Sequence, residues 1–142
     1  MIDPAQLDAK GKQAFENKKF EDAAEYFRQA AEGYSLGRSG LLSAEMRNNM
    51  SVALLQAGKP KEALEAALET DLVFSGANDL KRQAMALGNQ AAALEGLNRY
   101  NEAIEKYERS ADLFGQANEG DLRAMVMKSA AALKLKTGKI TD

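Results

Sequence analysis

Asparagine recurs in this sequence at a fixed interval. Asn49 is followed by Asn89 and, after the same interval again, by Ser129. A carboxamide both donates and accepts hydrogen bonds, so a row of asparagines can bind the backbone of an extended peptide without requiring a particular side chain. The alternative interpretation is that these are solvated polar positions that need no ligand. The three residues are therefore the first candidates for a binding site.

Residues that carry out covalent or acid–base chemistry are scarce. The chain has no histidine and no cysteine, which excludes imidazole bases, thiol nucleophiles and the usual ligands of zinc and copper. Acidic pairs such as Glu21 with Glu25 fall on predicted outward faces, where no burial would shift a pKa. The glycine-rich stretches around Gly37 and Gly120 lack the Gly-Lys-Ser/Thr of a phosphate-binding loop. We therefore expect no catalysis, no metal site and no cofactor.

Charge and hydropathy narrow the range of partners. The net charge of −2 over 142 residues gives no general attraction to phosphate, so we expect no nucleic-acid partner. The N-terminal residues lack the basic and apolar segments of a signal peptide. No apolar run approaches the roughly 18 residues that cross a bilayer, so we expect no membrane insertion. These features predict a cytoplasmic protein.

The interval that separates Asn49 from Asn89 also separates residues that determine packing. Small side chains recur at Gly11, Ser51, Ala91 and Ala131. Aromatic side chains recur at Tyr34, Phe74 and Phe114. A fixed period of this size is typical of a repeat array, and a small residue on a helix lets a second helix approach closely. Abundant alanine and only two prolines favour helices over strands.

The elements that must position these residues are predicted to be seven helices in one domain. Asp3 and Pro4 are typical of a helix start, and Gly58 with Pro60 separates two helices. The predicted helices cover residues 4–17, 20–34, 41–57, 60–74, 79–97, 100–114 and 121–136. Paired, they give repeats at about 4–37, 41–77 and 81–117, followed by a terminal helix at about 121–137.

The terminal helix is predicted to leave apolar surface exposed. It carries Met125, Val126, Met127, Leu133 and Leu135, which cannot all be buried against one preceding helix pair. The sequence therefore allows a homo-oligomer formed through this helix.

The pattern resembles the tetratricopeptide repeat (TPR) family, in which a large residue, a small pair and a large residue precede Ala-x3-Phe in the second helix. The matching residues include Leu7, Gly11, Ala14, Ala23, Phe27, Ser51, Leu54, Ala63, Leu87, Ala91, Leu94, Ala103 and Tyr107. The proline that usually closes a repeat is replaced by Ser35, Ser75 and Gly115. The period of 40 also exceeds the family's common length of about 34. Longer repeats of this kind resemble those of kinesin light chain and spindle-orientation adaptors.

The resemblance implies an all-α solenoid, a right-handed superhelix of about three helix pairs plus a C-terminal helix. In this family the first helix of each pair lines a concave groove that holds extended peptides or partner helices. Carried over by position, the implied lining includes Phe15, Glu16, Glu45 and Asn48. The site residues predicted within this lining are Lys12, Asn49, Val52, Leu55, Met85, Asn89, Ala92, Met125 and Ser129. The resembling long-repeat adaptors use asparagines at the positions of Asn49 and Asn89.

The implied lining favours an apolar or amphipathic ligand over a charged one. Val52, Leu55 and Met85 form an apolar stripe, in which methionine can adapt to different side chains. Val52 and Leu55 are equally well interpreted as core residues. The carboxylate clamp of co-chaperones is retained only at Asn49, because Asp8 replaces its first cation.

The sequence thus predicts a non-catalytic protein–protein interaction scaffold that binds a peptide or an amphipathic helix in its groove. The alternative prediction is a self-assembly or structural module of a larger or oligomeric protein.

Overall fold

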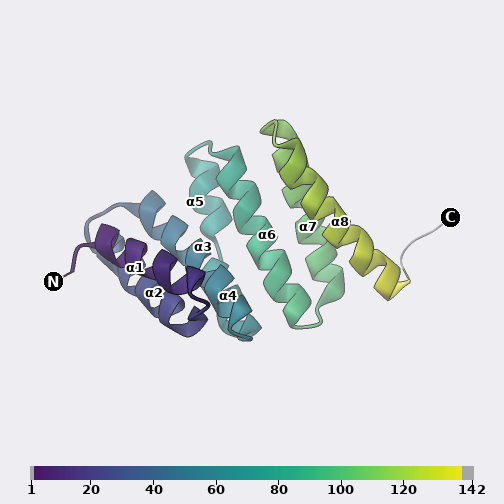
Figure 1. The fold of residues 1–142 in the computed structure, drawn as a ribbon. Coiled ribbons are helices and arrows are strands. Elements are labelled where there is room, and N and C mark those ends of the chain that lie inside the picture. The colour runs from purple at the N-terminus through teal and green to yellow at the C-terminus, as the bar shows by residue number, and fades with distance from the viewer. Residues whose placement is uncertain (1, 139–142) are drawn as a thin grey trace.

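A computed structural model describes residues 2–138 of the chain, and this range contains helices and no strand. The helices are Pro4–Glu16 (α1), Phe20–Leu36 (α2), Gly40–Gln56 (α3), Pro60–Ala67 (α4), Thr70–Gly76 (α5), Leu80–Gly96 (α6), Tyr100–Gln116 (α7) and Gly120–Thr137 (α8). They lie side by side in chain order, from α1 at one end to α8 at the other (Figure 1). The predicted all-α fold class is confirmed, and all predicted helices but one are found with closely matching ends.

The chain turns at a regular interval. A residue with positive φ stands at every twentieth position, namely Lys18, Arg38, Gly58, Asn78, Asn98, Asn118 and Gly138. Glycine and asparagine tolerate this left-handed conformation, whereas a side chain such as lysine costs about 1–2 kcal/mol there. Each full period of the sequence therefore contains two turns, which separate a first helical segment from a second.

Replacing Lys18 with glycine should stabilise the protein by about 0.5–1 kcal/mol, because it removes the strain of a φ of 60°. Chemical denaturation of the purified chain measures the effect. The matched control is Lys10→Gly in the middle of α1, which should instead destabilise by about 1 kcal/mol. Equal effects at the two positions would contradict the role given to Lys18.

Two helices begin with an aspartate cap. The Asp3 carboxylate accepts a hydrogen bond from the Ala5 backbone N–H at 3.1 Å, with Pro4 at the first helical position, as predicted. At the start of α6, the Asp79 carboxylate accepts from the Arg82 backbone N–H and guanidinium, each at 3.0 Å. The backbone bond, reinforced by the guanidinium, lowers the pKa of Asp79.

Asp79→Ala should lower the free energy of unfolding by about 1 kcal/mol at neutral pH, because α6 loses its cap. Since the folded state favours the ionised carboxylate, this contribution is present above the ordinary pKa of 3.8 and is lost as pH falls through the lower folded-state pKa. Urea denaturation at pH 7 and below pH 3 measures the difference in the free energy of unfolding between wild type and variant. This difference should become smaller in acid. Asp79→Asn, which keeps a capping oxygen, is the control and should lose less. A stability difference that does not depend on pH would contradict the assignment of Asp79 as the ionised cap of α6.

Small residues bring paired helices together at the positions expected from the sequence, with one exception. A Cβ atom at Gly11 would lie 2.7 Å from the Phe27 ring, so α1 touches α2 there. Ser51 is buried and its hydroxyl donates to the Ala63 carbonyl at 2.7 Å, and Ala91 is fully buried between α6 and α7. Ala131 is exposed, because no described helix follows α8. The prediction of a close helix contact is therefore wrong for Ala131.

The predicted helix over residues 60–74 is wrong, because the chain breaks it into α4 and α5 (Figure 1). Leu68 is extended and Glu69 is left-handed, with a φ of 66°. The carbonyl groups freed by the break are bound by side chains of α3. The Arg47 guanidinium donates to the Ala66 carbonyl at 3.0 Å and to the Leu68 carbonyl at 2.7 Å. Neighbouring helices thus supply the hydrogen bonds that a continuous helix would have made.

Buried polar side chains hold the other side of the break. The Gln90 carboxamide of α6 donates to the Ala67 carbonyl at 3.0 Å and to the Asp71 carboxylate at 2.9 Å. The Thr70 hydroxyl lies 2.8 Å from both the Asn48 carboxamide and the Ala67 carbonyl. All four side chains are buried. This polar network fixes α3, α5 and α6 relative to one another.

Candidate functional site

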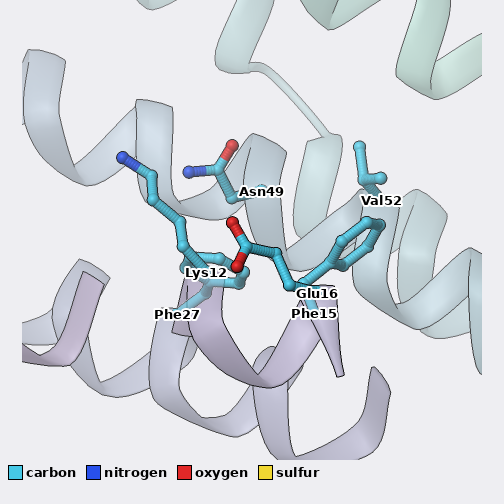
Figure 2. A pocket seen from close by; sticks show the side chains of 6 residues that line it. All are labelled: Lys12, Phe15, Glu16, Phe27, Asn49 and Val52. Atoms are coloured by element: carbon cyan, nitrogen blue, oxygen red, sulfur yellow. The ribbon is translucent and has the colours of Figure 1, made fainter. Parts of the chain in front are cut away.

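The first hollow on the surface lies between α1 and α3. Its cavity of about 270 Å³ is lined by Lys12, Phe15, Glu16, Phe27, Asn49 and Val52. In Figure 2 the polar ends of Lys12, Glu16 and Asn49 lie at its rim, while the Phe15 ring lies next to Val52. The hollow therefore combines an apolar floor with a polar rim, an arrangement common in ligand-binding sites.

Packing between helices holds the floor of this first hollow. Phe27 is buried against Gly11, and the Phe15 ring meets the Phe20 ring edge to face at 5.1 Å. The rim carries both signs of charge, since Lys12 and Glu16 both line the hollow and Lys12 pairs with Asp8 at 3.4 Å. The hollow therefore suits an apolar side chain flanked by hydrogen-bonding groups, rather than a strongly charged ligand.

A second hollow lies on the other side of Asn49, between α3, α5 and α6. Its cavity of about 270 Å³ is lined by Glu45, Asn48, Asn49, Phe74, Lys81, Arg82 and Met85. Arg82 pairs with Glu45 at 3.6 Å across this hollow and with Asp79 at 3.0 Å beside it. The buried polar network lies beneath it, because Asn48 belongs to both. Asn49 is thus shared by two hollows, one on each side of α3.

The structure brings three of the other predicted site residues together around Asn49. Lys12 and Val52 line the first hollow with it, and Met85 lines the second. Leu55 lies elsewhere, since it is half-buried against the core cluster that α1 to α4 form with Ala93 of α6. This placement matches its alternative interpretation as a core residue.

The remaining predicted residues lie on α6 and α8, outside both hollows. Asn89 and Ala92 are half-buried on α6. Ser129 on α8 donates to the Met125 carbonyl of its own helix at 3.3 Å, and the Met125 side chain is exposed. Beside them the Tyr107 hydroxyl donates to the Glu95 carboxylate at 2.9 Å, and burial, followed by this bond, raises the pKa of Tyr107. The predicted residues on α6 and α8 therefore line neither of the two hollows beside α3.

Sequence reasoning missed four residues that line the hollows. Phe27 and Phe74 fit the pattern of core aromatics, and both are buried, yet each also contributes to a floor. Lys81 and Arg82 stand in the first turn of α6, next to a predicted loop, and nothing in their spacing marks them as lining residues.

The arrangement offers non-covalent binding. Among residues 2–138, no three side chains of the metal-ligating types lie together, and no helix in this range has the length and apolar character needed to cross a bilayer. No model of a known protein family matches the chain, and no curated protein shows significant similarity to it. The function is therefore inferred from the hollows themselves.

Proposed function

We propose that the chain is a tetratricopeptide-like α-solenoid that serves as a non-catalytic scaffold for protein–protein interaction. The regular turns, the paired helices and the close contact at Gly11 support a repeat architecture. In this proposal α1, α3 and α6 are the first helices of three pairs, and their shared side is the binding surface.

The ligand is a peptide segment or amphipathic helix that places an apolar side chain in the first hollow and passes over the second, whose lining is mainly polar. The observation that carries this proposal is the position of Asn49, which lines both hollows. Its neighbour Asn48 is engaged by Thr70, whereas the Asn49 carboxamide lies at the open rim of the first hollow (Figure 2). A carboxamide there can bind the ligand backbone while the first hollow selects an apolar side chain. Asn89, at the equivalent position of α6, extends the same contact along the ligand.

Asn49→Ala combined with Asn89→Ala should weaken peptide binding about tenfold, because two hydrogen bonds of about 0.5–1.5 kcal/mol each are lost. The probe is a peptide selected by display on the wild-type chain, and calorimetric titration measures its affinity. Asn101→Ala, on the exposed side of α7, is the matched control and should bind like wild type. Unchanged affinity in the double variant with intact helicity, or selection that yields no binder, would contradict the proposal.

A further inference from the structure

A third hollow lies on a different surface, between α7 and α8. Its cavity of about 250 Å³ is open toward solvent along α8. Glu108, Ala111 and Asp112 line it from α7, and Arg123, Met127 and Ala130 line it from α8. None of these residues belongs to the two hollows beside Asn49.

This hollow repeats another one in the same register. The hollow between α2 and α3 is lined by Arg28, Ala31, Glu32, Ser43, Arg47 and Met50, which precede the six residues just named, in the same order, by two full periods. The earlier hollow has a further wall, because Glu62, Glu65 and Ala66 of α4 also line it. Within residues 2–138, the α7–α8 hollow has two walls of the same kind and no third wall.

On the side of α8 next to this hollow, side chains are exposed that a third wall would cover. Met127 is 46% exposed, whereas Leu87, at the equivalent position of α6, is fully buried. Ala131 is exposed, while its equivalents Ser51 and Ala91 are buried beneath the second helix of their pairs. Residues of the type that other pairs bury against a helix are therefore open on α8.

We propose that this α7–α8 hollow is a docking site for an amphipathic α-helix of a partner protein, lying antiparallel to α8 as α7 lies along α6. In this interface α8 contacts the partner helix in the way that α6 contacts α7. The partner helix is therefore expected to present the same kinds of side chain as α7. The apolar face of α7 carries Ala103, Tyr107, Ser110 and Phe114, all of which are buried. The partner helix therefore presents small residues and an aromatic residue at this helical spacing.

Charge at the rim specifies the partner further. In the earlier hollow the acidic residues Glu62 and Glu65 of α4 share the cavity with Arg28 of α2. In the α7–α8 hollow the position of Arg28 is taken by Glu108, which pairs with Lys134 at 2.9 Å, and Asp112 and Arg123 also line the hollow. The hollow thus holds two acidic and two basic side chains, so the partner helix presents uncharged polar residues at the α4 positions.

The test uses the full chain and a synthetic helix. The probe has the sequence of residues 99–117, with Glu102 and Glu105, the equivalents of Glu62 and Glu65, replaced by glutamine. Fluorescence anisotropy should show saturable binding, weakened at least tenfold by Met127→Lys or Ala131→Arg. Leu36→Lys, a matched change at an exposed leucine of α2, should leave binding unchanged.

Three results would overturn the proposal. The first is absence of binding. The second is binding that Ala131→Arg leaves unchanged. The peptide would then occupy another surface, such as the face of α6 that α7 normally covers. The third is a dimer, seen by light scattering and dissociated by Met127→Lys, that excludes the peptide, because the occupant would then be a second copy of the chain. Asn49→Ala with Asn89→Ala should not affect this peptide, so failure here is distinct from failure of the proposed groove function.

Discussion

Replacing Ala91 with leucine should lower the free energy of unfolding by about 3 kcal/mol, whereas the same change at Ala131 should alter it by less than about 0.5 kcal/mol. The two residues occupy equivalent positions on α6 and α8, one repeat period apart. Ala91 is fully buried in the cluster that joins α6, α7 and α8, so leucine there must push helices apart. Ala131 faces solvent and has room for a larger side chain.

Urea denaturation of the two variants beside wild type measures this contrast. Circular dichroism before denaturation controls for a change in helix content, since both substitutions place a good helix former in a helix. Similar losses at both positions would show that the described packing of α8 is incorrect.

Gln90→Leu should destabilise the protein by about 3 kcal/mol, because it leaves the buried Asp71 carboxylate without its hydrogen-bond donor. Gln90 is only 3% exposed and binds both the Asp71 carboxylate and the Ala67 carbonyl at the break between α4 and α5. Leucine matches the size of glutamine but donates no hydrogen bond. The loss should appear in thermal and urea denaturation.

A double-mutant cycle separates this network from simple packing. Adding Asp71→Asn to Gln90→Leu removes the buried charge, so the two substitutions together should cost less than the sum of each alone. Gln13→Leu on the exposed side of α1 is the matched control and should be close to neutral. Additive effects at positions 71 and 90 would contradict the proposed network.

Local sequence signals predicted most of the helices. Asp3 and Pro4 mark the start of α1, and Asn98 and Asn118 stand at left-handed turns where asparagine is tolerated. Each of these signals acts within a few residues of the structure that it determines. The alternation of helix and tight turn was therefore predictable from one sequence.

The break at Glu69 was not predictable, because its causes are distant in sequence. Residues 60–74 are rich in alanine, leucine and glutamate, which favour a continuous helix. The opposing hydrogen bonds come from Arg47, about one helix earlier, and from Gln90, about one helix later. Tertiary hydrogen bonds overrode local propensity at this point.

The candidate site was predictable in part for a similar reason. The repeat interval identified Asn49, and the structure places Lys12, Val52 and Met85 around the same two hollows. Phe27 and Phe74 were assigned to the core because a period shows which face a residue occupies but not how far its ring extends. Leu55 was placed in the lining although α3 turns it toward the core.

We propose that the peptide binds on the side of α1, α3 and α6 that carries the two hollows. Backbone amide chemical shifts, followed during titration with the display-selected peptide, test this binding site most directly. We predict that the largest shifts fall on Lys12, Asn49, Val52, Arg82 and Met85. Shifts confined to α2, α4 and α7, with these five residues unchanged, would contradict the account.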